Sequence, residues 1–261
     1  MKAATMPSQR NPKNSYGRER RADAQIHIYG SHAAEAALGN MARPILRVTA
    51  TANAANRIAD LLARRNAEPV IVSPRDLDRM LGEGAVHQGV TVEVGPLPPL
   101  DVEDLHEASI VLVLDQITDP HNVGAILRSA AAFGAGGVVM TAHHAPPLSG
   151  ALAKAASGAL DTIPVVLAAN LARALEELGQ IGFIRVGLDS EADGFMEVQH
   201  LGEKVALVLG AEDKGLRRLT RENCDFICAL ETASTLRSLN VSNAAAVALH
   251  TIRQAQKSRA L

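Results

Sequence analysis

The chain has 261 residues, of which 47% are apolar and 2% aromatic, and its formal net charge at pH 7 is -2. This apolar content is sufficient for two compact domains, whereas no stretch approaches the roughly 20 apolar residues of a membrane span and no secretory signal is apparent, so we expect a cytoplasmic protein. The net charge excludes a global attraction for nucleic acid, and the scarcity of aromatic rings disfavours RNA binding by stacking of bases on a sheet.

Residues 1–24 are locally basic, with six Lys or Arg side chains against two acidic ones and a net charge of +4. Their Asn, Ser, Pro and Arg content cannot bury apolar surface, so we expect a disordered arm whose contacts to phosphate depend on salt and not on base sequence. A solvated terminus without function and a mitochondrial transit peptide have similar compositions and remain alternatives.

Residues 25–97 alternate short apolar runs with helical patterns and are expected to form a small α/β domain. Ser31 stands where a helix would be capped, and Gly39 stands where that helix would stop. The predicted strands cover residues 26–29, 45–48, 70–72 and 90–94, and the predicted helices cover residues 31–38, 54–65 and the segment that follows 73–74.

Residues 98–107 combine prolines with four acidic side chains and are expected to form a solvated linker. Beyond the linker, residues 108–261 contain six runs of β-branched residues and Leu, each of strand length and separated from the next by a helical pattern. Such runs are typical of strands buried on both faces, so we expect a parallel sheet covered by helices. The predicted strands are 110–114, 137–140, 164–167, 183–188, 205–209 and 226–230, and the last predicted helix is 242–256.

The glycine-rich segment 133–137 could be mistaken for a dinucleotide-binding loop. It follows a helical pattern and precedes a strand, whereas a phosphate-binding loop needs the strand first and the helix second. We therefore interpret it as a helix stop.

A metal site is not expected. Cys224 and Cys228 are the only cysteines, and they lack the second pair that a zinc site would need; we expect reduced, packed thiols, with zinc as the alternative. His121, His143 and His144 offer imidazoles, but the sequence shows no pattern that brings three ligands together.

Three polar loops stand at the ends of apolar segments, at residues 114–128, 208–215 and 236–243. The first passes from a buried strand through a polar loop into a helix. The other two have the same layout, so together the three loops predict one composite pocket at the edge of the sheet.

Several side chains in these loops are candidates for chemistry. Asn122 is expected to open a helix as its N-cap, and Arg128 stands among apolar residues, where a guanidinium needs an anion or a carboxylate as partner. Glu212, between two glycines that let the backbone turn tightly, offers that carboxylate; the alternative is a turn residue in solvent. The last helix begins with more candidate caps than it needs, which suggests that some of them bind something else: Ser238, Asn240, Ser242 and Asn243.

The three loops also contain three spaced motifs. N-x-G-x-x-x-R is met by Asn122, Gly124 and Arg128, G-x-E-x-x-G by Gly210, Glu212 and Gly215, and S-L-N-x-S by Ser238, Leu239, Asn240 and Ser242. In spacing and order they resemble the motifs of the SPOUT superfamily, in its branch of RNA ribose 2'-O-methyltransferases. Residues 28–30 and 84–90 are similar to the start and the end of the L30e-like RNA-binding domain that precedes the catalytic domain in the ribosomal-RNA enzymes of this branch.

This resemblance implies an α/β fold with a SPOUT parallel-sheet domain at 108–261, a carboxy-terminal trefoil knot, and an L30e-like domain at 25–97. It also implies S-adenosylmethionine as cofactor, no metal, and a homodimer whose sites are shared between subunits. The implied cofactor contacts are Gly210, Leu230 and Leu239. The implied catalytic residues are Asn122, Arg128, Glu212, Ser238 and Asn240. Before the third motif, the family pattern I-P-M-x-G is replaced here by Leu-Glu-Thr-Ala-Ser at 230–234, in which Leu230 can still serve.

The implied activity is methylation of a ribose 2'-hydroxyl in ribosomal RNA, with a guanosine in the peptidyl-transferase region of 23S rRNA as the expected target. A tRNA ribose methyltransferase and a non-catalytic RNA-binding ribosome-assembly factor are the alternatives. The front domain would recognise RNA shape, helped by the basic arm and by Arg64, Arg65 and Arg75. Since its acidic and basic side chains are balanced, a basic surface there would require the two kinds of charge to be segregated.

In the family, the arginine of the first motif, Arg128 here, has been proposed as the base. A guanidinium has a pKa above about 12 and is a poor base at neutral pH. We therefore expect Arg128 to hold a phosphate or the developing alkoxide, with Glu212 and Asn122 fixing its orientation, while the proton leaves through water or phosphate.

Overall fold

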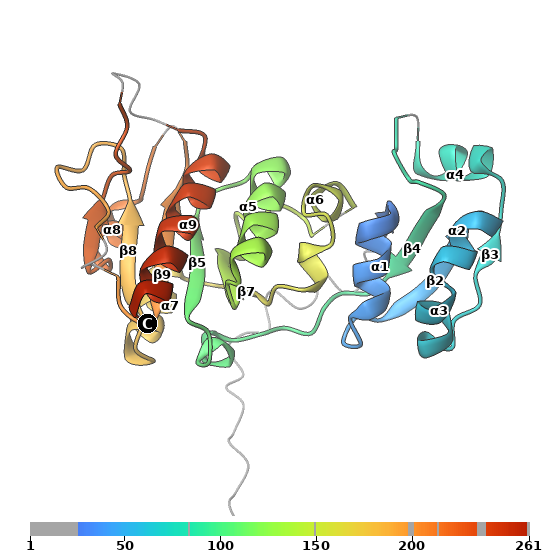
Figure 1. Cartoon of the computed structure of the whole chain (residues 1–261), viewed down its shortest axis with the longest axis horizontal. Helices are drawn as coiled ribbons and strands as arrows, with labels where there is room; N and C mark the ends of the chain where they lie inside the picture. Colours follow the sequence, from blue (N-terminus) through green and yellow to red (C-terminus); the bar gives the residue numbers. More distant parts are fainter. Residues whose placement is uncertain are drawn as a thin grey trace, which may run out of the picture.

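The computed structural model of the protein describes residues 26–82, 84–148, 150–197, 201–212, 214–233 and 239–259. Two sheets lie side by side along the long axis of the molecule (Figure 1). Residues 1–24, for which a disordered arm is predicted, lie outside the described residues. In the described part, no helix combines the length and the hydropathy needed to cross a membrane.

The first sheet has the strand order β1-β4-β2-β3. β1 (Ile26–Tyr29) and β2 (Ile45–Ala50) both pair antiparallel with β4 (Val90–Val94), and the short β3 (Val70–Ile71) pairs parallel with β2. The predicted alternation of strands and helices in this region is confirmed. Its helices are α1 (Ser31–Gly39), α2 (Ala52–Arg57), α3 (Ala59–Arg65) and α4 (Pro74–Leu81).

Two local predictions in this region are wrong. Ser31 does not cap α1: Gly30 occupies the cap position at φ +91°, and the N–H and hydroxyl of Ser31 both donate to Oε1 of Gln88 at 2.8 Å. The helix predicted at 54–65 is divided into α2 and α3 at Ile58, whose ψ of 15° leaves the helical range. In the first case the cap lies one residue earlier than predicted, and in the second a break at Ile58 divides the predicted continuous helix.

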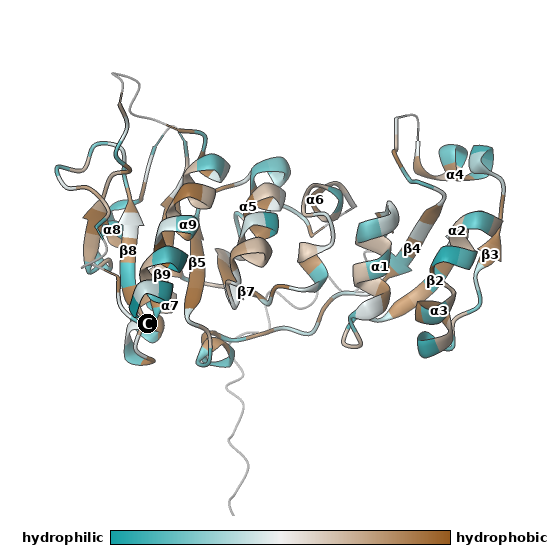
Figure 2. Cartoon of the chain, in the orientation of Figure 1, coloured by the Kyte–Doolittle hydropathy of each residue, from teal (hydrophilic) through white to brown (hydrophobic). Residues whose placement is uncertain are grey.

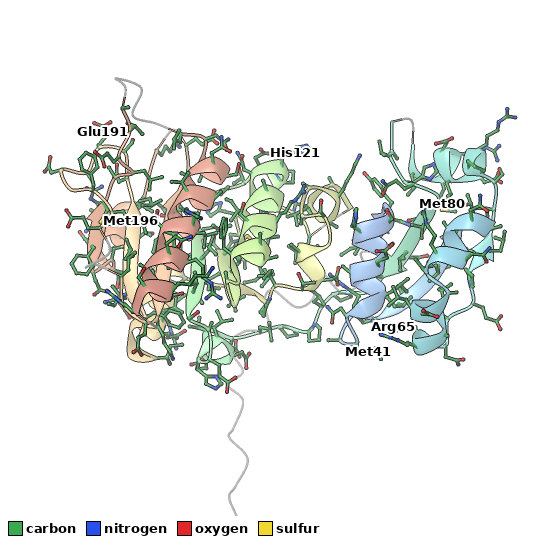
Figure 3. All side chains as sticks on the ribbon, in the orientation of Figure 1. Met41, Arg65, Met80, His121, Glu191 and Met196 are labelled. Carbon is green, nitrogen blue, oxygen red and sulfur yellow. The ribbon has the colours of Figure 1, made fainter. Side chains whose placement is uncertain are left out.

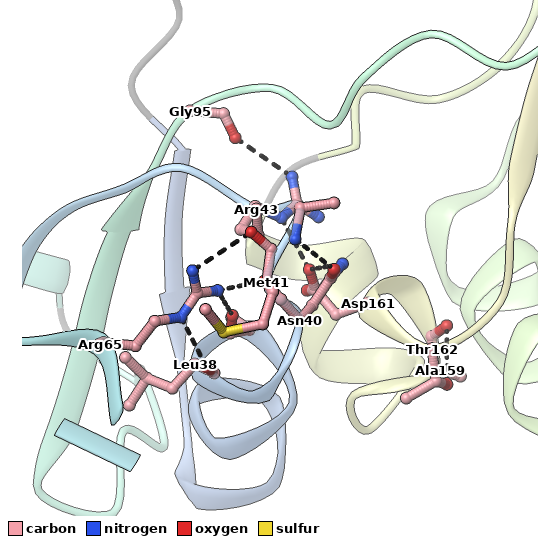
Figure 4. Close-up of polar contacts among 11 residues, drawn as sticks. Leu38, Asn40, Met41, Arg43, Arg65, Gly95, Ala159, Asp161 and Thr162 are labelled. Atoms are coloured by element: carbon pink, nitrogen blue, oxygen red, sulfur yellow. Dashed lines mark hydrogen bonds and ion pairs between the residues drawn. The ribbon is translucent and has the colours of Figure 1, made fainter. Parts of the chain in front are cut away.

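Arg65 is a structural residue of this domain. Its guanidinium donates to four carbonyl oxygens at and just beyond the end of α1, among them those of Leu38 at 2.8 Å and Met41 at 3.4 Å (Figure 4). A cation here satisfies carbonyl groups that the helix leaves unpaired. The structure thus gives Arg65 a role in the fold, and the RNA contacts predicted for Arg64, Arg65 and Arg75 stay predictions; Arg64 and Arg75 are exposed.

The second sheet has six strands in the order β10-β8-β9-β5-β6-β7, and all neighbours pair in parallel. Each of the six predicted strands is present, so the predicted parallel sheet is confirmed. Gly134 ends the helix after β5 at φ +71°, which confirms the predicted helix stop. The strands are β5 (Ile110–Asp115), β6 (Gly137–Thr141), β7 (Val165–Ala168), β8 (Ile184–Leu188), β9 (Val205–Gly210) and β10 (Phe226–Cys228).

Helices cover both faces of this sheet because its central strands are apolar on both sides, as Figure 2 shows for β5. Leu112 and Leu114 pack in one core with α5, α6 and α9, while Val111 and Val113 pack in a second core with α7 and the turn η2. The helices and 3-10 turns are η2 (Val102–Leu105), α5 (Pro120–Phe133), α6 (Gly150–Ala155), η3 (Ala159–Asp161), α7 (Leu171–Gln180), α8 (Arg218–Glu222) and α9 (Val241–Arg259).

An ion pair that is almost wholly buried joins the two sheet domains (Figure 4). Nε of Arg43 lies 2.7 Å from Oδ1 of Asp161, and each side chain is 1% exposed. Asn40 donates to the same Asp161 oxygen at 3.3 Å, and Arg43 also donates to the carbonyl of Gly95 at 3.2 Å. If one partner of such a pair moved away, the other charge would stay buried without a counter-ion, which is energetically costly. The ion pair therefore favours one relative placement of the two domains.

The thiols of Cys224 and Cys228 are free, as predicted. Burial raises the pKa of Cys224 from 9.0 to about 12 and also raises the pKa of Cys228. Above pH 9 an unfolded thiol ionises while the folded Cys224 stays protonated, so its contribution to stability falls as the pH rises towards 12.

We therefore expect Cys224→Ala to cost less stability at pH 10 than at pH 8, as measured by urea unfolding of the variant and the wild type at both pH values. If the free energy of unfolding of Cys224→Ala differed from that of the wild type by the same amount at pH 8 and at pH 10, the raised pKa of Cys224 would be contradicted.

Candidate active site

The loops that follow β5 and β9 and the segment that leads into α9 meet at the carboxyl edge of the second sheet. β5 and β9 are neighbours, with Asp115 opposite Gly210 at their ends. From β5 the chain continues into α5 on one face, and from β9 it continues towards α8, which packs against α7 on the other face. Neighbouring parallel strands whose connections leave to opposite faces open a crevice at their carboxyl ends, where ligands commonly bind in α/β proteins.

Three residues, one from each motif, are joined by hydrogen bonds at this edge. Oε1 of Glu212 accepts from Nδ2 of Asn240 at 2.7 Å, from Nδ2 of Asn122 at 3.1 Å and from the backbone N–H of Val241 at 3.3 Å. Nδ2 of Asn240 also lies 3.0 Å from Oδ1 of Asn122. The three predicted loops therefore converge, and one carboxylate oxygen holds them together.

Asn122 is not the helix cap that the sequence predicts. Asp119 caps α5, its carboxylate accepting from the N–H groups of His121 at 3.1 Å and Asn122 at 3.3 Å, and Pro120 is the first helical residue. Asn122 thus lies inside the first turn. Its amide is free of capping and can reach Glu212.

Asn240 combines two tasks. Its Oδ1 accepts from the N–H groups of Ser242 at 3.0 Å and Asn243 at 3.4 Å, which caps α9, while its Nδ2 donates to Glu212. The hydroxyl of Ser242 also donates to Oδ1 of Asn240, at 2.6 Å. The prediction that this helix start does more than cap itself is thereby given a structural basis, and Ser238 lies outside the described residues.

The loop after β9 folds back over the end of its own strand. The N–H of Gly215 donates to the carbonyl of Ala211 at 2.8 Å, and Gly215 has φ +60°. A Cβ on Gly210 would lie 2.3 Å from the carbonyl carbon of Gly215, closer than any side chain allows. The two glycines of the second motif are therefore required by this turn.

Two of the predicted cofactor contacts are apolar side chains near the same edge. Leu230 lies just beyond β10, is half-buried and packs against the main core, whereas Leu239, one residue before Asn240, is 40% exposed. Gly210, the third predicted contact, is the last residue of β9. This edge of the sheet therefore offers both apolar and polar contacts to a ligand.

Arg128 and Asn122 lie on different sides of α5 and face different parts of the protein. The two residues are six positions apart on α5, which at 3.6 residues per turn places them about 120° apart around the helix axis. Arg128 is exposed and lines a cavity of about 320 Å³ together with residues of α1 and of the segment 156–162. No hydrogen bond or ion pair connects it to Glu212 in the described chain, so the expected orientation of Arg128 by Glu212 and Asn122 is not found within one chain.

Gly124 explains the glycine of the first motif. It is four residues before Arg128 and so lies on the same face of α5, where a Cβ would stand 2.4 Å from Cβ of Ala155 in α6 and 3.0 Å from two backbone atoms. Only a glycine lets α5 and α6 approach so closely. The motif therefore joins an amide directed at the sheet edge to an arginine directed at α6 and η3.

Asp115 was not among the site residues predicted from the sequence. Its carboxylate is fully buried at the end of β5, accepts from the N–H of Arg217 at 2.9 Å and lies 2.6 Å from Nε of the same arginine. Asp115 thus connects the end of β5, from which the first loop leaves, to Arg217, which follows the second loop. The sequence did contain a signal for this residue: Asp115 is the one charged residue of an otherwise apolar strand, and a buried carboxylate needs a partner.

No group of three or more His, Cys, Asp and Glu side chains is placed to hold a metal ion within the described ranges. His121 is exposed at the start of α5 (Figure 3), and His143 and His144 are exposed in the loop after β6.

Comparison with known proteins agrees with this geometry. The model of the SpoU rRNA Methylase family matches residues 109–250, and the model of the domain described as RNA 2'-O ribose methyltransferase substrate binding matches residues 27–100. The 23S rRNA (guanosine-2'-O-)-methyltransferase RlmB of Pseudomonas putida is 41% identical over 244 residues, which cover 89% of this chain and 98% of that protein.

Two solved structures share the fold. The SpoU methyltransferase AviRb from Streptomyces viridochromogenes, in complex with the cofactor AdoMet, has a TM-score of 0.77 at 23% identity and covers 95% of this chain and 99% of its own. The TrmH/SpoU tRNA modifying enzyme of A. aeolicus has a TM-score of 0.52 at 19% identity and covers 61% of this chain and 84% of its own. Because the family model spans more than half of the sequence and a relative is 41% identical along most of it, the chain belongs to the SpoU rRNA Methylase family.

Proposed function

We propose that this protein transfers the methyl group of S-adenosylmethionine to the 2'-hydroxyl of a guanosine ribose in 23S rRNA. The observation that carries the proposal is the cluster of Asn122, Glu212 and Asn240, through which three motifs meet at the carboxyl edge of a parallel sheet. The identity to RlmB proteins supports the substrate class. A nucleotide in the peptidyl-transferase region, and the cytoplasm as the compartment of ribosomal RNA, are part of this proposal.

The residues at the sheet edge suit this cofactor. Leu230 and Leu239 would contact its apolar parts, and the backbone at Gly210, at the end of β9, would offer a polar contact. When bound, S-adenosylmethionine supplies an electrophilic methyl group on a sulfonium. The protein's own task is to hold the ribose oxygen in line with that methyl group, since positioning accounts for much of the rate in such displacements. Arg128 would hold a phosphate or the developing alkoxide, as a permanent cation with a fixed fork of donors.

A homodimer with shared sites is also proposed. It is supported by Arg128, which lies about 120° around α5 from Asn122 and so does not reach the Glu212 cluster of its own chain. In such a dimer, Arg128 of one chain would reach the cluster of Asn122, Glu212 and Asn240 in the other. The trefoil knot belongs to the same proposal, and residues 234–238, which stand between β10 and α9, lie outside the described residues.

The test is methyl transfer by the purified protein from labelled S-adenosylmethionine to unmodified 23S rRNA, followed by digestion and mass spectrometry of the nucleosides. We expect 2'-O-methylguanosine at a single position. Transfer to tRNA instead would favour the tRNA enzyme, which is disfavoured because the A. aeolicus tRNA enzyme matches only 61% of this chain. Normal RNA binding without transfer to any RNA would favour the non-catalytic assembly factor and overturn the proposal.

Glu212→Ala is expected to weaken the binding of S-adenosylmethionine by about tenfold, since it removes the oxygen that three donors from the first and third loops share. Titration calorimetry with the cofactor measures the change. Glu212→Gln is the matched control, because it retains an acceptor oxygen of the same reach and should stay within about threefold of wild type. Equal affinities for wild type and Glu212→Ala would contradict the role of the cluster.

A further inference from the structure

A cavity lies at the junction of the two domains, on the side of α5 that carries Arg128. It has a volume of about 320 Å³, which falls in the range of about 300–1,000 Å³ typical of ligand sites. His32 and Ala36 of α1 line it from the front domain, and Ser157 and Thr162 line it from the segment around η3. Figure 1 shows α1 as the front-domain helix that faces the catalytic domain.

The polar groups of this cavity suit an anion. Arg128 and His32 are both exposed, and within the described part of the chain neither side chain has a hydrogen-bond or ion-pair partner. No carboxylate lines the cavity. The nearby Asp161 is engaged by Arg43 and Asn40, so it does not neutralise the guanidinium.

The distance across the cavity is set by close packing at both ends of α1. At the start of the helix, Gly158 has φ +91°, and a Cβ there would stand 2.8 Å from Cβ of Ala36 and 2.9 Å from the carbonyl oxygen of His32. Beyond the end of the helix, the Arg43–Asp161 ion pair fixes the chain to η3 (Figure 4). The front domain therefore presents His32 to Arg128 as part of a fixed frame.

We propose that His32 is a substrate-binding residue that the front domain contributes to the catalytic site, and that with Arg128 it holds a phosphodiester of the RNA backbone next to the methylated ribose. The inference rests on the proposed function and deepens it. A guanidinium and an imidazole N–H are both donors that phosphate oxygens accept, and backbone contacts of this kind position RNA without reading its bases. The Ala and Gly residues that line the rest of the cavity leave room for the RNA backbone.

The test uses His32→Leu, which keeps side-chain volume and removes the donor, and His32→Gln, which keeps a donor. In methyl transfer to 23S rRNA we expect His32→Leu to raise KM for RNA about tenfold with kcat within about twofold of wild type, and His32→Gln to stay within about threefold. Affinity for S-adenosylmethionine and the thermal unfolding midpoint should be unchanged. His106→Leu is the control, since His106 is 65% exposed at η2, away from the cavity.

An unchanged KM for His32→Leu, or a KM raised equally by Leu and Gln, overturns the inference, as does a loss of cofactor affinity or thermal stability with His32→Leu. In each case the wild type still methylates 23S rRNA, so the proposed function stands. If the wild type itself transfers no methyl group, the proposed function fails, and direct binding of a 23S rRNA fragment then decides on His32. About tenfold weaker binding by His32→Leu than by His32→Gln supports the contact, and equal binding rejects it.

Discussion

Arg128→Ala is expected to lower kcat for ribose methylation by about 10²- to 10³-fold, the usual cost of removing one preorganised donor that stabilises developing charge. Binding of S-adenosylmethionine should be unchanged, because the hydrogen bonds of the Glu212 cluster do not involve Arg128. Thermal stability should also be unchanged, since the side chain is exposed and unpaired within the described residues. Single-turnover transfer to 23S rRNA at saturating cofactor measures the loss.

Arg128→Lys separates two roles for the arginine. If the positive charge is the requirement, lysine should keep part of the activity, although it loses the bidentate geometry of the guanidinium. A lysine variant as inactive as Arg128→Ala, with normal RNA binding and an intact fold, would reject the charge-holding role in favour of a function specific to the guanidinium.

The strands of the second sheet were predictable because each is apolar on both faces, a pattern that the sequence displays directly. The convergence of the three loops followed from their positions at strand ends. Which side chain pairs with which did not follow, since Asp119 displaced Asn122 from the cap and so freed it to bind Glu212. The cap is the residue just before the first helical residue, and because Pro120 begins α5 the cap lies at Asp119, three residues earlier than the predicted Asn122.

The separation of Arg128 from Asn122 could have been anticipated from the helix period alone, because residues six positions apart do not lie on the same face. The ion pair at the domain junction could not have been anticipated from the sequence. Arg43 and Asp161 are 118 residues apart in the sequence, and neither lies in a motif. The contacts of Arg65 with the end of α1 were not predictable either, since a surface guanidinium for RNA and one that caps a neighbouring helix look alike in sequence.

Gly124→Ala is expected to destabilise the protein by about 1–3 kcal/mol, the typical cost of overpacking, although alanine is intrinsically the better helix former by up to about 1 kcal/mol. The sign is decided by the contact of 2.4 Å that the new Cβ would make with Cβ of Ala155, which forces α5 and α6 apart. The shift should also displace Arg128 and raise KM for RNA, since α6 leads directly into the segment that lines its cavity. Urea unfolding and steady-state methylation measure the two effects.

Two further variants test whether the close contact of α5 with α6 is the cause. Gly39→Ala is the matched control, because a Cβ there meets nothing within 4 Å, and its stability should stay within about 0.5 kcal/mol of wild type. Ala155→Gly removes the atom with which the new Cβ collides, so the double variant should recover part of the stability that Gly124→Ala loses, the contacts of 3.0 Å to backbone atoms remaining. If Gly124→Ala were as stable as Gly39→Ala, or if Ala155→Gly gave no recovery, the close approach of α5 and α6 would not be what requires glycine in the first motif.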